Sequence, residues 1–450
     1  MGERARTTAD RIDSFLGDWR EDEDVPGVSA VVFDEQGVRV ATGLGEREVE
    51  SGAPATPDTL YSVASLSKPV VALAVLRLID RGEIDLDGDI GAYVPILDDV
   101  PGDPITVEEL LSHSSGIPRD FSALHGTIDD GQDLGLLEHV RGAADQRLLD
   151  RDRYMYSNGG YFVLGELIEA VDGRPYDRYV GEEVLDPLGM ERSTFDPDAL
   201  RTDDDAMTGY AERDGELVVK TYDGGAGSAG GLISSPRELT RLGRCVLDGG
   251  EVEGSRILDS DLLAKATNLQ SPPLPTSDDS RRGYGYGWEI GEFAEQLLAS
   301  HLGGIDGASA YIGVLPKDGL GVALALNRHG PPAATLGQAL LAIACGEEPA
   351  DRVRAIKLSE VVETVSGTYG AYRNAETVVV EPVRMGLIEL TVEGFALSVT
   401  ASPEEIGDDR YVFSVRPGDG ALWLAEFRET ETGLELVLSM GKWTTVLTEQ

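Results

Sequence analysis

The distribution of apolar residues changes near residue 346, and this change restricts the folds that the chain can adopt. Before it, segments with helical and with alternating apolar spacing are mixed. Beyond it, about eight short alternating segments follow one another, and no helix-length apolar pattern occurs. Regular short strands of this kind form a sandwich or a closed antiparallel barrel. The sequence predicts an α+β domain over 1–346, a polar linker over 347–360 and an antiparallel β-barrel over 361–450.

Within the first domain, apolar spacing predicts individual helices and strands. The clearest is an apolar helix over 65–81, which carries Pro69 in its first turn and stops at Gly82. Further helices are expected over 8–20, 236–248 and 331–344, and strands over 28–33, 38–42, 310–315 and 322–326.

The chain is strongly acidic: its 450 residues include 81 Asp and Glu against 38 Lys and Arg, a net charge of −43. This balance excludes nucleic-acid binding by phosphate neutralisation and docking on an anionic membrane. Only six of the basic residues are lysines. An acidic, lysine-poor chain with an ordinary apolar content is typical of a protein that folds in concentrated salt, which screens surface carboxylates. We expect such an environment; an ordinary acidic protein is the alternative.

Cysteine content and apolar runs bear on compartment and cofactors. Cys245 and Cys345 are too few for a disulfide framework, and no Cys/His spacing suggests zinc. The N-terminal residues lack the apolar stretch of a signal peptide, and no run of 18 apolar residues occurs. We therefore expect a cytoplasmic protein without a metal or cofactor.

Ser65 and Lys68 form an S-x-x-K motif at the start of the predicted apolar helix. Residues three apart share a helix face, so the Lys68 ammonium can reach the Ser65 hydroxyl. A serine attacks a carbonyl only when a neighbour takes its proton, and a lysine can do so when burial lowers its pKa. In a chain with so few lysines, this one favours chemistry over an ordinary surface position.

Two further motifs contain groups that could assist. Tyr156 and Asn158, in Y-S-N, offer a phenol for proton relay and an amide to fix the lysine or a substrate carbonyl. His301 precedes a Gly-Gly pair ahead of a predicted strand. A backbone N–H there could complete an oxyanion hole with that of Ser65, and the histidine could act as acid or base near neutral pH. Taken singly, a capping asparagine and a histidine in a turn are the alternatives.

Together and in this order, the three motifs resemble those of the serine β-lactamase and penicillin-binding-protein superfamily. The resemblance is closest to its class C β-lactamase-like branch, the CubicO group, and covers about residues 8–345. It implies an antiparallel sheet flanked by helices, an all-helical subdomain, and a site between them. Surrounding segments also resemble the framework of that branch: ITVEELLSHSSGIP (105–118), YSNGGYFVLGELIE (156–169), GSAGGLISSPRELTRL (227–242) and YGYGWEI (284–290).

Carried over residue by residue, the resemblance implies roles for the first two motifs. Ser65 is the acylated nucleophile and Lys68 the proton acceptor. Tyr156 is the general base or proton relay, and Asn158 a positioning group.

The third motif departs from the class C pattern. True class C β-lactamases have a lysine, in K-T-G, where this chain has His301; histidine resembles the esterase and D-peptidase members. Gly303 is the glycine of the motif, and the resemblance implies an oxyanion hole from the backbone N–H groups of Ser65 and Gly304. This departure and the absence of a signal peptide argue against β-lactam hydrolysis. The salt signature suggests an archaeon without ordinary peptidoglycan, which argues against a cell-wall role.

The C-terminal region resembles the lipocalin-like domain appended to some archaeal serine peptidases of this group, with GTY (367–369) as its motif-like element. The resemblance implies a barrel that helps to assemble a closed homo-oligomer and restricts access to short peptides. An accessory barrel with no catalytic part is the alternative.

Two other features were given no catalytic role. His113, in LLSHSSG, is expected to be structural, and the G-x-G-x-x-G at 225–230 lacks the context of a dinucleotide site.

The sequence thus leads to a serine hydrolase that forms an acyl-enzyme on a small molecule or short peptide. A peptidase, D-amino-acid-containing substrates included, and a carboxylesterase are equally favoured. A genuine β-lactamase and a non-catalytic binding protein of the same fold are the alternatives. We expect loops within 119–150 and 205–228 to line the substrate pocket and decide between these classes.

Overall fold

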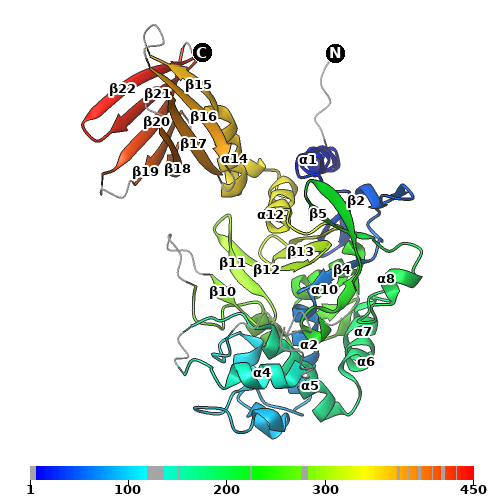
Figure 1. Cartoon of the computed structure of the whole chain (residues 1–450). Coiled ribbons are helices and arrows are strands. Elements are labelled where there is room, and N and C mark those ends of the chain that lie inside the picture. The colour runs from blue at the N-terminus through cyan, green and yellow to red at the C-terminus, as the bar shows by residue number, and fades with distance from the viewer. Residues whose placement is uncertain are drawn as a thin grey trace. The chain divides into compact units, whose positions relative to one another are not determined.

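The structure is a computed structural model that describes residues 7–118, 136–149, 153–222, 226–274, 282–371, 376–383, 386–393, 397–407, 409–416, 421–431 and 433–450. The chain divides into two compact units, Met1–Gly346 and Glu347–Gln450 (Figure 1). Of the expected pocket loops, residues 119–135, 150 and 223–225 lie outside the described residues.

An antiparallel sheet forms the centre of the first unit, in the strand order β10-β11-β12-β13-β14-β1-β2-β3. Every residue of β1, β13 and β14 is buried, because helices cover both faces of these central strands. The strands are β1 (Gly27–Asp34), β2 (Gly37–Glu48), β3 (Ala53–Pro54), β10 (Gly283–Tyr284), β11 (Glu289–Phe293), β12 (Gln296–Ile305), β13 (Ala308–Leu315) and β14 (Leu320–Leu326).

Two helices pack closely on opposite faces of this sheet, α10 (Pro236–Leu247) and α12 (Ala333–Ala344), with α1 (Thr8–Asp22) beside α12 (Figure 1). The ring of Phe33 fills the space under α10, where a Cβ on Gly243 would lie 2.2 Å from it. Tyr311 does the same under α12, where a Cβ on Gly337 would lie 2.1 Å from its ring. These three predicted helices are confirmed, with boundaries within two residues of those expected.

A buried helix, α2 (Ser67–Asp80), runs through the core of the first unit, and nearly all of its residues are buried. It contacts α5 (Asn158–Asp172), which carries the Y-S-N motif at its start. The predicted helix over 65–81 therefore begins two residues later than expected. Ser65 lies in the turn before it, directly after Ala64, whose backbone is left-handed with a φ of 49°.

The remaining elements of the first unit are short. The helices are η1 (Ile90–Ala92), η2 (Pro95–Leu97), α3 (Val107–Leu111), α4 (Leu136–Ala144), α6 (Tyr176–Val180), η4 (Gly181–Leu185), α7 (Asp186–Leu188), α8 (Ala199–Thr202), α9 (Gly227–Gly230) and α11 (Ser260–Ala266). The strands pair as β4 (Tyr61–Ala64) with β7 (Leu232–Ser234), β5 (Gly209–Arg213) with β6 (Glu216–Lys220), and β8 (Glu251–Val252) with β9 (Ser255–Arg256).

The second unit is a closed antiparallel barrel in which β15 pairs with β22 as well as with β16. Alternate residues point into its apolar core, as the alternating sequence predicts. The predicted α+β fold with a C-terminal barrel is confirmed. Its strands are β15 (Gly367–Gly370), β16 (Thr377–Val383), β17 (Leu387–Glu393), β18 (Leu397–Ile406), β19 (Arg410–Val415), β20 (Trp423–Thr430), β21 (Gly433–Met440) and β22 (Trp443–Glu449).

The segment 347–360, expected as a polar linker, is largely helical. It carries α13 (Pro349–Arg352) and most of α14 (Arg354–Val365). Val361, Val362 and Val365 of α14 pack into the barrel core, and Leu358 lies under Gly386. These four apolar residues have helical spacing, but the stripe crosses the boundary assumed at residue 360, so the polar half alone resembled a linker.

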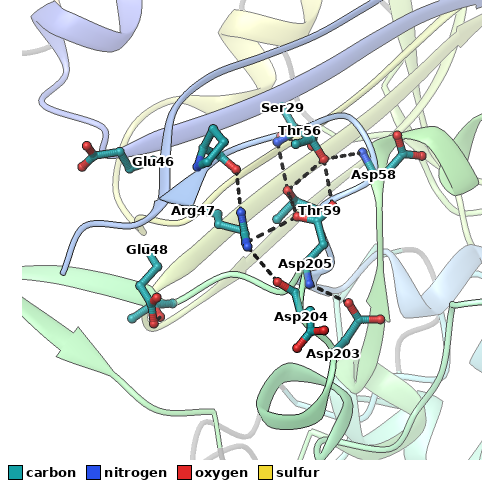
Figure 2. Close-up of polar contacts among 12 residues, drawn as sticks. Ser29, Glu46, Arg47, Glu48, Thr56, Asp58, Thr59, Asp203, Asp204 and Asp205 are labelled. Atoms are coloured by element: carbon teal, nitrogen blue, oxygen red, sulfur yellow. Dashed lines mark hydrogen bonds and ion pairs between the residues drawn. The ribbon is translucent and has the colours of Figure 1, made fainter. Parts of the chain in front are cut away.

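A network of polar contacts anchors the segment that enters β4, the strand before Ser65 (Figure 2). The Asp205 carboxylate accepts hydrogen bonds from the hydroxyls of Thr56, at 2.9 Å, and Thr59, at 2.7 Å. Arg47 lies 3.4 Å from the same carboxylate and donates to the carbonyl of Asp204. The Leu60 N–H donates to the Asp205 carbonyl, so the network holds the chain just before the strand.

Every helix in the described part of the chain is too short or too polar to cross a membrane. Across the same described ranges, no three or more His, Cys, Asp or Glu side chains gather in an arrangement that could hold a metal ion.

Removing the Asp205 side chain tests this anchor. Asp205→Ala leaves the buried Thr59 hydroxyl, the half-buried Thr56 hydroxyl and Arg47 without their shared acceptor, which we expect to lower the free energy of unfolding by about 2 kcal/mol. Urea unfolding measures the change. Asp204→Ala is the matched control, because it removes the same charge from a neighbouring side chain for which no contact is described. Equal effects of the two substitutions would contradict the anchoring role.

Candidate active site

Ser65 sits in a tight turn between β4 and α2, half-buried at the start of the buried helix. The Ser67 hydroxyl fixes this turn: it donates to the carbonyl of Ala64 at 2.7 Å and accepts from the N–H of Leu232 at 2.9 Å. The turn that carries Ser65 is therefore tied to β7 through the Ser67 side chain.

Lys68 is fully buried, one turn after Ser65, and its Nζ reaches three oxygen atoms. These are the Ser65 Oγ at 3.1 Å, the Asn158 Oδ1 at 2.9 Å and the Ala229 carbonyl at 2.7 Å. The predicted S-x-x-K contact is thus present, and so is the predicted contact between Asn158 and the lysine.

The protonation of Lys68 follows from this environment. Burial lowers the pKa of Lys68 well below its usual value, and the nearby Glu289 carboxylate opposes this shift. A neutral amine can donate two hydrogen bonds, to Asn158 and Ala229, and turn its lone pair toward the Ser65 hydroxyl. The same geometry suits the ammonium, which donates to all three oxygens, so a proton can move between Ser65 and Lys68 without rearrangement.

Tyr156 is the second neighbour of the nucleophile, and its hydroxyl donates to the Ser65 Oγ at 3.0 Å. Its ring lies close to the amine, with the Lys68 Nζ 4.8 Å from the ring centroid. The cap of α5 is Ser157, whose Oγ accepts from the Gly160 N–H. Asn158 is therefore not the helix cap, which was the structural alternative for this motif.

His301 lies near this cluster but differs from expectation. It is fully buried, and its ring centroid is 6.4 Å from that of Tyr156. Its Nδ1–H donates to the Leu302 carbonyl and its Nε2 accepts from the Tyr284 hydroxyl, both at 2.8 Å. Burial, and then the charge of Lys68, lower the pKa of His301 to about 3. Such a histidine does not fit an acid or base that titrates near neutral pH.

The glycines after His301 lie on β12, which runs beside β4. A Cβ on Gly303 would lie 2.1 Å from the Val63 carbonyl oxygen, so only glycine lets these two strands approach. A Cβ on Gly304 would lie 2.9 Å from the His329 ring. Gly303 thus lets β12 lie against the strand that leads to Ser65. The oxyanion hole from the Ser65 and Gly304 N–H groups stays a prediction.

Two groups of the site were not predicted. The Ala229 carbonyl comes from the glycine-rich segment at 227–242, in which the sequence predicts framework and no contact with Lys68. Glu289 lies on β11; burial raises its pKa to about 7, while a Leu302 N–H and Lys68 act in the opposite direction. The only feature of the sequence that could have indicated Glu289 is its position as the single acidic residue of the aromatic and apolar segment YGYGWEI.

Comparison with known proteins assigns both parts of the chain. Residues 10–345 match the Beta-lactamase family, and residues 349–443 match the Pab87 octamerisation domain. Penicillin-binding protein 4 of Amycolatopsis lactamdurans is 28% identical over 320 residues, which cover 68% of this chain and 82% of that protein.

Solved structures agree with this assignment. An octameric penicillin-binding protein homologue from Pyrococcus abyssi is similar over 97% of this chain and 99% of its own, with a TM-score of 0.85 and 28% identity. A D-amino acid amidase from Ochrobactrum anthropi SV3 shares the fold over 75% of this chain and 99% of its own, with a TM-score of 0.61 and 21% identity. The resemblance drawn from the motifs is confirmed: the chain belongs to the beta-lactamase family of serine hydrolases.

Proposed function

We propose that this protein is a serine hydrolase that cleaves an amide or ester bond through an acyl-enzyme on Ser65. The observation that carries the proposal is the pair of contacts on one oxygen atom. The Ser65 Oγ lies 3.1 Å from a buried amine and 3.0 Å from a phenol. A serine with two proton-transfer partners within hydrogen-bond distance has what an activated nucleophile needs.

The reaction follows from these contacts. The neutral amine of Lys68 takes the proton of Ser65 as the Oγ forms a bond to the substrate carbonyl carbon. Backbone N–H groups of Ser65 and Gly304 receive the oxyanion. Tyr156 then gives its proton to the leaving nitrogen or oxygen as the bond to carbon breaks, and the Lys68 ammonium restores that proton. Water then attacks the acyl-enzyme by the same steps, and this second attack releases the carboxylic acid and restores Ser65.

The substrate class that we favour is a short peptide or a related amide, D-amino-acid-containing substrates included, with carboxylic esters as the second class. The shared fold of a D-amino acid amidase supports the first class, although only at the level of the fold. His301 occupies the position at which class C β-lactamases carry a lysine. This difference argues against β-lactam hydrolysis and against recognition of a β-lactam carboxylate at this position. A salt-rich cytoplasm completes the proposal, supported by the net charge of −43.

We also propose that the barrel assembles the chain into a homo-oligomer. The match of residues 349–443 to an octamerisation domain supports this, as does the octameric relative that is similar over 97% of the chain. Light scattering on the protein in molar salt should give a mass close to eight chains of 48.1 kDa. A mass of one chain at micromolar concentration would exclude assembly.

The nucleophile is tested by Ser65→Ala. We expect hydrolysis of p-nitrophenyl acetate and of D-alanine p-nitroanilide to fall by about 10³-fold or more, because no other group replaces the attacking oxygen. A fluorophosphonate should label the unmodified protein at Ser65, and mass spectrometry can locate the labelled residue. Assays belong in molar salt with folding checked by circular dichroism. Hydrolysis that survives the substitution would refute the assignment.

The protonation of Lys68 predicts a pH profile. Only the neutral amine accepts the Ser65 proton, and burial lowers its pKa. The value of kcat/KM should therefore rise with pH and level off well below pH 10.5. Since the charge of Glu289 raises the pKa of Lys68, Glu289→Gln should shift the rise of kcat/KM to lower pH.

Glu292→Gln is the matched control for that substitution, because Glu292 lies exposed on the same strand. Its profile should coincide with that of the unmodified enzyme. If Glu289→Gln leaves the rise of kcat/KM at the same pH, or shifts it to higher pH, the coupling between Glu289 and Lys68 is contradicted.

A further inference from the structure

His113 forms hydrogen bonds with the main chain on both sides of Tyr156. It follows α3, is fully buried and has a left-handed backbone with a φ of 57°. Its carbonyl accepts the N–H of Met155 at 2.8 Å, and its Nδ1 accepts the N–H of Ser157 at 3.2 Å. One residue thus binds the main chain immediately before and immediately after the tyrosine that contacts the nucleophile.

The imidazole ring also packs against Tyr156 itself, with 4.4 Å between the ring centroids. The rings of Tyr284 and Tyr161 lie on the histidine at 4.5 and 5.1 Å. The Tyr161 hydroxyl donates to the carbonyl of Leu111, which closes the cluster against α3. The position of the Tyr156 ring is therefore determined by contacts of the histidine side chain as well as of its backbone.

The ring has one defined protonation state. Because Nδ1 accepts from Ser157, the proton of the neutral ring is on Nε2, which is buried and has no hydrogen-bond partner among the described residues. Burial, and then the charges of Lys68 and His301, hold the pKa of His113 well below its usual value. A buried polar atom without a partner lowers stability, and its retention is usual where a group has a function.

We propose that His113 is a positioning residue that holds the Tyr156 hydroxyl on the Ser65 Oγ. The proposal rests on the proposed function, in which Tyr156 moves the proton. The proposal gives the histidine no contact with substrate. Its acceptor nitrogen, its carbonyl and its ring fix residues 155–157, so that the Tyr156 hydroxyl stays 3.0 Å from the Ser65 Oγ. A displacement of about 1 Å at such a contact lowers a rate by about 10²-fold.

Two substitutions separate the acceptor from the backbone. Glycine and asparagine both tolerate a left-handed φ, so His113→Gly and His113→Asn keep the carbonyl contact to Met155. Asparagine offers an Oδ1 at the position of the histidine Nδ1, whereas glycine offers nothing. We expect His113→Gly to lower kcat by about 10²-fold with KM changed by less than about threefold, and His113→Asn to recover at least about 10-fold of this loss.

Leu188→Ala is the control for general loss of stability, because Leu188 is buried on α7 and has no role in the site. Its melting temperature should fall while kcat stays within about twofold. If His113→Gly does not fold, His113→Ala takes its place as the variant without an acceptor: a kcat at least about 10-fold below that of His113→Asn supports the proposal, and equal kcat values overturn it.

A double substitution shows whether His113 acts through Tyr156. In a Tyr156→Phe background there is no hydroxyl left to position, so His113→Gly should change kcat by less than about threefold. An equal loss in both backgrounds would mean a structural role only and would overturn the proposal. If instead Ser65→Ala remains as active as the unmodified protein, the proposed function itself fails, a result that the His113 variants do not influence.

Discussion

The burial of one amine is the constraint on which the rest of this site depends. Lys68 is inaccessible to solvent, and three oxygen atoms around its Nζ accept its hydrogen bonds. A charged ammonium in such surroundings is destabilised, and this makes the amine a useful base. Each of the three oxygens comes from a different part of the chain. The lysine therefore fixes where the turn at Ser65, the start of α5 and the segment of α9 must meet.

This arrangement contrasts with the rest of the molecule. The chain carries a net charge of −43, yet the charged groups near the nucleophile are few, and each shows a pKa shifted by burial. Glu289 and His301 are both driven toward their neutral forms, as Lys68 is. Salt screens exposed carboxylates and has little effect on buried groups. The charge of the surface can thus vary while the electrostatics around Lys68 stay the same.

The sequence was sufficient for those features whose signals are local. The S-x-x-K spacing placed Lys68 beside Ser65, and the alternating strands predicted a barrel. The helix α14 was not predicted, because its apolar stripe spans the boundary placed at residue 360. Ala229 and Glu289 could not be predicted: a backbone carbonyl has no sequence signature, and the proximity of Glu289 to the lysine arises only when β11 takes its place in the sheet. His301 has a pKa that depends on burial, which the motif does not encode.

The closure of the barrel has a consequence for how copies of this chain can meet. Because β15 bonds to β22, every strand of the barrel has a neighbour on both sides, and the barrel has no free edge strand. This favours contact between copies through side chains of the barrel surface. In concentrated salt, apolar contacts strengthen while exposed ion pairs weaken, and outward residues such as Val446 and Leu422 are the kind of surface on which evolution can build that contact.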